Sequence, residues 1–179
     1  MPDFSGAPAV FRGGVAQVVI TPPLGCSLAG YFHERIAESV RDDLHAKAMV
    51  LESQGERIAL VSCDLVCLTT DIAEQSKALI ESEVGIAPDH VLLCATHTHT
   101  GPEPRPSSWV PQATEWVAGL PRLIAKAVAE AASKMVPVTL RLGKAEAEGY
   151  AWNRLFRLKD GQEVFGKAGR EDQVLGTAG

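Results

Sequence analysis

Residues 57–68, RIALVSCDLVCL, decide the fold class, because the run that starts at Ile58 is nearly continuous and apolar. Such a run is typical of a strand that is covered on both faces. The apolar run AKAMVLE at 46–52 precedes it across a short turn, so we expect these two strands to form a hairpin. A further strand is predicted at 15–21, VAQVVIT, which Pro22 ends.

Helical patterns flank the next strand. Residues 70–84 combine helix-compatible apolar spacing with an acidic first half, and Gly85 supplies a C-terminal stop. The apolar run VLLCA at 91–95 predicts a strand, and a second helix is clearest from Pro121, in a first-turn position, until Pro137 ends it. Strands and helices in this order predict an α/β fold with mixed sheets and flanking helices.

The C-terminal part is less regular. VTLRLGKAEA at 138–147 alternates well enough to predict a half-exposed strand, and residues 154–165 predict a hairpin around Asp160-Gly161. The segment from Gly166 onward is small and polar and has no periodicity that would close a domain. We therefore expect the 179 residues to form one unit that stops within a loop, as part of a larger domain.

Charge and composition exclude several classes of protein. The chain has 17 Lys and Arg against 22 Asp and Glu, a net charge of −5, which gives no footprint for nucleic acid. No apolar stretch approaches the roughly 20 residues that span a bilayer. The N-terminus lacks a secretory signal, so the chain as written is expected in the cytoplasm. No phosphate-binding glycine loop or serine-hydrolase elbow occurs.

The segment His97-Thr98-His99 carries the sharpest chemical signal. Residues i and i+2 of an extended backbone point to the same side, so two imidazoles can converge on one cation or on its bound substrate. The pair directly follows the apolar strand and precedes Gly101-Pro102, which lets the backbone turn beside a ligand. The alternative is that both rings only satisfy loop carbonyls.

Other polar residues near this segment have more than one reading. The hydroxyls of the neighbouring threonines are candidate partners for the imidazoles. Asp64, an acid at the end of an apolar run, could support His97 or His99, or accept a hydrogen bond from a loop N–H. The remaining histidines and the cysteines, which are expected to be buried free thiols, have no evident chemical role; they are His33, His45, His90, Cys26, Cys63, Cys67 and Cys94.

Asn153 and Arg154 follow Tyr150 and Trp152 and form a candidate substrate clamp, because a guanidinium suits a carbonyl or anionic oxygen. A surface arginine in a loop is the equal alternative. The prolines that follow Gly101 predict a stiff, shaped wall beside the histidines rather than a linker.

Several motifs, in order along nearly the whole chain, resemble the N-terminal catalytic domain of the neutral/alkaline non-lysosomal ceramidase family. They are GVAQVVITPPLGCSLAGY (14–31), AKAMVLE (46–52), IALVSCDL (58–65), LLCATHTHTGP (92–102) and WNR (152–154). The resemblance implies a zinc-dependent amidase that splits the N-acyl bond of a ceramide-like lipid, with contact to a membrane surface to reach its substrate. Family members are often secreted.

Carried onto this sequence, the resemblance implies that His97 is a zinc ligand, and that His99 and Arg154 contact the substrate. The family completes its zinc site with a later histidine, a glutamate and a tyrosine, and none of those motifs occurs in the sequence. The resemblance therefore implies a fragment with weak or no activity alone. The alternatives are an inactive binding module, or another H-x-H metal hydrolase such as a phosphoesterase.

Overall fold

The computed structural model describes residues 11–106, 109–147, 149–150, 153–167 and 169–178. Trp152 lies outside these ranges. The chain divides into two compact units, at residues 1–140 and 141–179, and each is described here by itself. No described helix combines the length and the apolar composition needed to cross a membrane.

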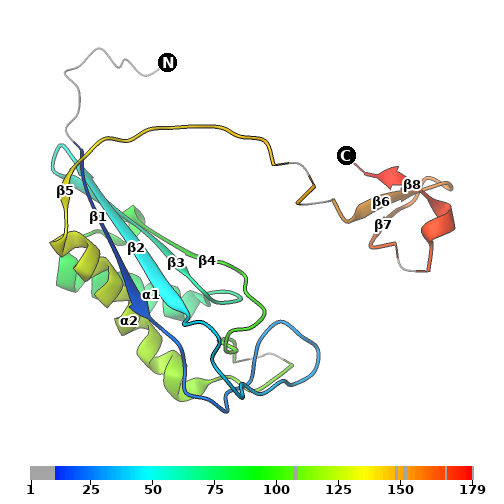
Figure 1. Ribbon diagram of the computed structural model, residues 1–179, viewed down its shortest axis with the longest axis horizontal. Helices are drawn as coiled ribbons and strands as arrows, with labels where there is room; N and C mark the ends of the chain where they lie inside the picture. The colour runs from blue at the N-terminus through cyan, green and yellow to red at the C-terminus, as the bar shows by residue number, and fades with distance from the viewer. Residues whose placement is uncertain (1–10, 107–108, 148, 151–152, 168, 179) are drawn as a thin grey trace. The chain divides into compact units, whose positions relative to one another are not determined.

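A five-stranded mixed sheet organises the first unit, in the order β4-β3-β2-β1-β5 (Figure 1). The predicted α/β class is confirmed, and so is the hairpin of the second and third strands, because β2 and β3 pair antiparallel from Ala46↔Cys63 to Ser53↔Glu56. β4 pairs parallel with β3 after a crossover through α1. The elements are β1 (Phe11–Val19), β2 (His45–Ser53), β3 (Glu56–Cys63), α1 (Thr70–Val84), η1 (Pro88–His90), β4 (Val91–Ala95), α2 (Thr114–Ser133) and β5 (Val136–Val138).

Both helices cover the same face of this sheet (Figure 1). α1 has the predicted bounds: the Thr69 side chain accepts a hydrogen bond from the Ile72 N–H, and Gly85 ends the helix in a left-handed conformation. The strands present small side chains to α2, which lets it lie close to the sheet. A Cβ built on Gly14 would lie 2.0 Å from the Ala131 carbonyl oxygen. The core is therefore a layer between the sheet and two helices.

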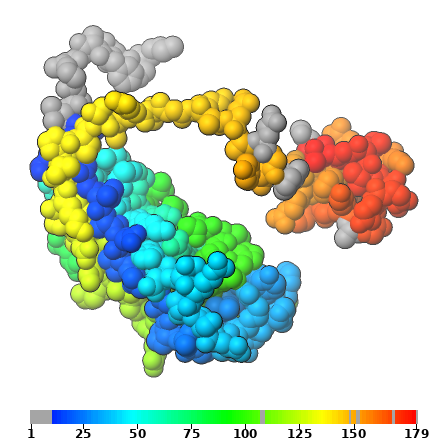
Figure 2. Space-filling view, in the orientation of Figure 1, coloured from blue at the N-terminus to red at the C-terminus, as the bar shows by residue number. Residues whose placement is uncertain are grey.

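The opposite face of the sheet has no described layer over it. Side chains that point away from the helices are exposed or half-buried, among them Val15, Leu60 and Leu92. Atoms of β1 and β2 lie at the surface in the view of Figure 2. Among the described residues, the prediction that the strand in 57–68 is covered on both faces is thus wrong: one face is packed and the other is apolar but open.

Helix α2 begins earlier than predicted. It starts at Thr114, so Pro121 lies inside the helix and not in its first turn. Proline removes one helical hydrogen bond, yet packing of the first two turns outweighs that loss. The indole N–H of Trp116 donates to the Ile20 carbonyl at 2.8 Å, and Leu120 is fully buried. Tertiary contacts, which a local pattern does not contain, extend this helix.

The predicted strand at 138–147 is largely wrong, because only Val136–Val138 form β5. β5 pairs with β1, and the last residue pair of this ladder is Phe11↔Val138. Phe11 is the first described residue of β1, so the ladder ends there. Residues beyond Val138 have no described strand to pair with, and Leu142 is fully exposed. An alternating pattern needs a partner edge to become a strand.

The second unit is a small three-stranded sheet in the order β7-β6-β8. The predicted hairpin around Asp160-Gly161 is confirmed, since β6 and β7 pair antiparallel across it. The tail differs from the prediction of an irregular end, because β8 pairs with β6. The elements are β6 (Leu155–Leu158), β7 (Glu163–Phe165), η2 (Glu171–Gln173) and β8 (Val174–Thr177).

The cysteines are free thiols, as predicted, but only one is buried. Cys63 lies in the core, and burial raises the pKa of its thiol to about 12. Cys26 and Cys67 are half-buried, and Cys94 is exposed on the open face of the sheet. The prediction of uniformly buried thiols is therefore wrong for the other three.

Candidate metal and substrate site

The candidate site begins where β4 ends. The Thr96 N–H still donates to the Cys63 carbonyl oxygen at 3.0 Å, and the chain leaves the sheet at the next residue. His97 adopts a left-handed backbone with φ of 62°, which costs a residue with a side chain on the order of 1 kcal/mol. Such conformations persist where the surrounding structure holds them, and they cluster at functional sites.

A backbone carbonyl sets the tautomer of His97. The Nδ1 atom lies 2.7 Å from the Val66 carbonyl oxygen, which can only accept, so Nδ1 carries the proton and donates it. The lone pair of His97 is then on Nε2. This atom faces Nε2 of His99 at 3.2 Å, and the two ring centroids are 4.9 Å apart. The two histidines therefore converge, although His97 is not in the extended conformation from which the H-x-H spacing predicted it.

The position of His97 fits a zinc ligand. The Val66 carbonyl takes the Nδ1 proton, as a carbonyl or carboxylate normally does for a ligating histidine, and leaves the Nε2 lone pair for a metal ion. The Nε2 atom of His99, at 3.2 Å from that lone pair, would lie beside the ion. No cluster of three or more potential ligands occurs among the described residues, so His97 is one ligand of an incomplete coordination set.

A second loop holds His99 in place. Gly30 has φ of 94°, and a Cβ on it would lie 2.3 Å from Cγ of His99, so only glycine admits the imidazole here. The Tyr31 ring lies edge-on to His99, with centroids 6.3 Å apart. Arg35 donates from Nη2 to the carbonyl oxygens of Ala29 and His99, and its guanidinium lies 3.9 Å from the Tyr31 centroid.

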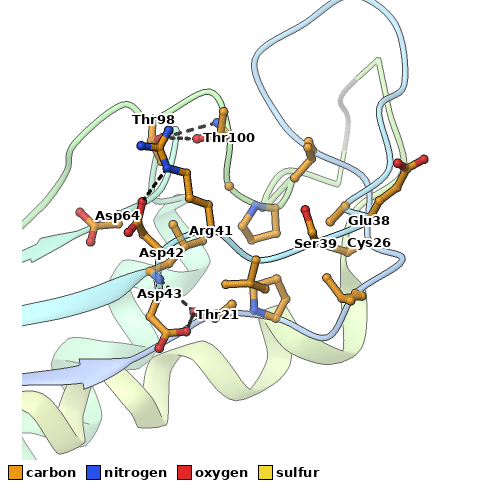
Figure 3. Close-up of a pocket in the computed structure, with 18 of the residues that line it drawn as sticks. Thr21, Cys26, Glu38, Ser39, Arg41, Asp42, Asp43, Asp64, Thr98 and Thr100 are labelled. Carbon is orange, nitrogen blue, oxygen red and sulfur yellow. Dashed lines mark hydrogen bonds and ion pairs between the residues drawn. The ribbon is translucent and has the colours of Figure 1, made fainter.

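The threonines that alternate with the histidines face another way. Thr96, Thr98 and Thr100 line a cavity of about 800 Å³ whose other walls come from the loop before β2 (Figure 3). The hydroxyls of Thr98 and Thr100 lie 3.1 Å apart and bond to each other. The histidines and the threonines of this segment thus lie on different sides of it. The His97 ring is held by the Val66 carbonyl.

Asp64 also lines this cavity. Its Oδ2 accepts a hydrogen bond from the His45 backbone N–H at 3.1 Å and lies 3.3 Å from the Lys47 ammonium. Asp64 thus accepts a backbone N–H, as one of its two readings predicts, but the donor is the first residue of β2 and not a loop residue. The carboxylate ties the start of β2 to the end of β3.

The loop after Gly101 forms the stiff wall that its prolines predict. Pro102 and Pro104 are fully buried, and so is the Glu103 carboxylate between them. Arg105 binds Glu103 through two nitrogens, each at 2.7 Å, and this hydrogen bonding raises the pKa of the guanidinium above its usual value. The Ala113 N–H donates to the Glu103 carbonyl oxygen, which closes the loop before α2.

Arg154 belongs to the second unit, where its guanidinium lies over the Phe165 ring at 5.2 Å from the centroid. The Asn153 side chain bonds at both ends to backbone groups of this unit, Ala178 O and Leu155 N, so it holds the local fold. The substrate role of Arg154 stays a prediction.

The supports of the histidine pair were not predicted from the sequence. Val66 contributes only a carbonyl, so its side chain gives no signal. Gly30 and Tyr31 end the motif at 14–31, but nothing in its spacing links them to His99. Arg35 is six residues from the carbonyl of Ala29 and 64 from that of His99, a contact that only the tertiary structure reveals.

Comparison with solved structures links the fold to ceramidases. The chain is similar to the crystal structure of neutral ceramidase from Pseudomonas aeruginosa, with a TM-score of 0.67 and 22% identity over 73% of this chain and 23% of that chain. A ceramidase complexed with C2 gives a TM-score of 0.64 and 22% identity over 72% and 22%. The chain thus spans less than a quarter of the length of these proteins, and the expected fold is confirmed. No family model and no curated protein sequence matches it.

Proposed function

We propose that this chain provides the first metal ligand of a zinc-dependent amide hydrolase that acts on N-acylated, ceramide-like lipids. One observation carries the proposal: the Nε2 atoms of His97 and His99 lie 3.2 Å apart, on a loop in which His97 is held in a strained backbone conformation. The similarity of the fold to two ceramidase structures supports the same reaction class.

In this proposal His97 binds the metal through Nε2. Its Nδ1–H stays on the Val66 carbonyl, which fixes the ring plane and keeps the lone pair directed toward the site. When bound, zinc lowers the pKa of a coordinated water toward neutrality and polarises an amide carbonyl. The further ligands lie outside the described cluster, so this chain alone is expected to bind zinc weakly.

His99 is the proposed substrate contact. Because the His97 Nε2 carries a lone pair, the proton between the two rings belongs to His99 Nε2. Once that lone pair is used for coordination, the His99 N–H can donate to the amide carbonyl oxygen, where negative charge develops during hydrolysis. Gly30, Tyr31 and Arg35 fix the direction of this N–H. Arg154 is the proposed second donor to the substrate.

The test is a zinc titration of the intact chain by calorimetry, with the variants His97→Ala and His90→Ala. His90 is half-buried beside Glu56 and is remote from the pair in the described contacts, so it is the matched control. We expect His97→Ala to reduce zinc affinity at least 10-fold, a loss of at least about 1.4 kcal/mol of binding free energy, and His90→Ala to leave it unchanged.

Equal zinc affinity in His97→Ala and the unaltered chain would overturn the ligand assignment. Zinc binding that depends on His97, together with no hydrolysis of an N-acyl sphingoid amide by any longer form of the protein, would favour a binding module instead. Hydrolysis of a phosphate ester but not of the amide would favour the phosphoesterase alternative.

A further inference from the structure

Two of the most exposed aromatic side chains of the described residues lie side by side near the histidines. Phe32 is 85% exposed and Trp109 is 78% exposed, and their rings meet edge to face with centroids 6.1 Å apart. Contiguous exposed apolar surface of this kind marks an interaction site, because leaving it in water is unfavourable. We call these two residues the aromatic pair.

Described backbone contacts lie close to each member of the aromatic pair. Phe32 lies at the tip of the segment 26–37, which folds back on itself through an antiparallel bridge at Ser27↔Ile36 and a hydrogen bond from the Leu28 N–H to the Arg35 carbonyl oxygen. Trp109 precedes the buried Val110, in the loop that the hydrogen bond from the Ala113 N–H to the Glu103 carbonyl oxygen closes. Because the backbone on both sides of Phe32 is already held by these bonds, little conformational entropy is lost there when the ring binds something.

The aromatic pair borders the candidate site. Phe32 directly follows Tyr31, whose ring contacts His99, and Arg35 ties the same segment to the His99 carbonyl oxygen. Whatever binds Phe32 and Trp109 is therefore brought close to His99.

The charges near the aromatic pair indicate which kind of membrane surface it could bind. In the segment around Phe32, Glu34 and Arg35 carry opposite charges, and in the loop that contains Trp109 the buried Glu103 is paired with Arg105. The whole chain carries a net charge of −5. This surface therefore offers no attraction for an anionic membrane, which usually requires a cluster of basic residues. Tryptophan and phenylalanine at loop tips instead suit insertion at the boundary between headgroups and acyl chains.

We propose that the aromatic pair docks this protein on a zwitterionic lipid surface, so that a lipid substrate enters beside His99. The choice of a lipid surface rests on the proposed function, since a water-insoluble amide has to be reached where it is dissolved. The docking itself uses burial of two aromatic rings and no ion pairing.

The test is co-sedimentation of the intact, metal-free chain with phosphatidylcholine vesicles. We expect the double variant Phe32→Ser/Trp109→Ser to lower the partition coefficient roughly 10-fold or more, as burial of two rings predicts. The control Phe165→Ser removes an aromatic ring that is 75% exposed in the second unit and leaves binding unchanged. Added phosphatidylglycerol or 0.5 M salt changes binding less than about 3-fold.

Equal vesicle binding by the double variant and the unaltered chain would overturn the inference, as would binding that needs anionic lipid and disappears in salt. Absence of vesicle binding together with self-association that the double variant abolishes would assign the aromatic pair to a second copy of the chain. The zinc titration is independent of this readout: vesicle binding retained by His97→Ala would leave the docking in place even where the proposed zinc site failed.

Discussion

The two faces of the five-stranded sheet are built from the same strands but from different side chains. Toward the helices β1 and β2 present Gly14, Ala46, Ala48 and Val50, all buried. The other face carries larger apolar side chains, and two shallow grooves of about 310 and 340 Å³ run across it. Residues that line these grooves include Val15, Met49, Leu51, Leu60, Leu92, Val136 and Val138.

The comparison teaches that side-chain size, and not apolarity alone, separates the packed face from the open one. A helix can approach a sheet closely only where the strands carry glycine and alanine, so the packed face is the one with the smaller residues. On the open face β3 carries Ile58 and Leu60 beside the polar Ser62, yet nothing described covers it. An apolar run shows that a face can be covered and does not show what covers it.

The largest expected effect comes from Gly14→Ala on the packed face. The added methyl group would lie 2.0 Å from the Ala131 carbonyl oxygen and 3.0 Å from the Met135 backbone nitrogen, and backbone atoms cannot move aside. We expect a loss of about 3 kcal/mol or more in the free energy of unfolding, measured by urea denaturation.

Gly119→Ala is the matched control, because a methyl group there meets nothing within 4 Å. Alanine in a helix interior is favoured over glycine, so this variant should be more stable by about 0.5–1 kcal/mol. A similar small effect of both substitutions would mean that α2 does not lie this close to β1.

The second prediction compares one substitution on the two faces. Val50→Ala removes two methyl groups from a fully buried side chain and should cost about 2 kcal/mol of unfolding free energy. Val15→Ala, on the neighbouring strand, alters a side chain that is 66% exposed and should cost less than about 0.5 kcal/mol. Equal costs in thermal or urea unfolding would show that the open face is covered in solution.

The smallest effect is a pH dependence from Cys63. Burial raises the pKa of this thiol to about 12 in the folded chain, against about 9 when it is unfolded. Between these values the unfolded chain loses the proton and the folded chain keeps it. Stability is therefore unaffected below about pH 8 and falls as pH rises, by at most about 1.4 kcal/mol per pH unit.

Urea unfolding at pH 7.5 and pH 9.5, with Cys63→Ala as the reference, isolates this contribution from lysine and tyrosine titration. The difference between the two proteins should shrink at the higher pH. On the other face, the exposed Cys94 should react with a thiol reagent in the native state while Cys63 reacts only on unfolding. Rapid native labelling of Cys63 would contradict the packed core.

Local patterns predicted the elements whose signals are complete in the sequence. The helix at 70–84 has its cap, its acidic start and its terminal glycine within one short segment, and its observed bounds agree. The first part of α2 and the extent of β5 depend instead on Ile20 and on the start of β1, which are distant in sequence. Such partners are absent from any local window.

In the candidate site, too, some features could be predicted from local sequence and others depend on distant residues. The spacing of His97 and His99 indicated that the rings would converge, but not how, because His97 lies beyond β4 in a left-handed and not an extended conformation. The tautomer of His97 depends on a carbonyl 31 residues earlier, and the orientation of His99 depends on the segment around Gly30. Backbone groups and close approaches of this kind carry no residue signature.

At position 97 the left-handed backbone lowers the stability of the folded chain, while the histidine side chain serves the proposed function. Glycine and asparagine adopt this conformation at lower cost than histidine does. A screen that selects only for heat resistance would therefore favour replacing His97, and with it the proposed ligand. Engineers who want a sturdier protein should hold this residue constant and gain stability elsewhere, for example in α2.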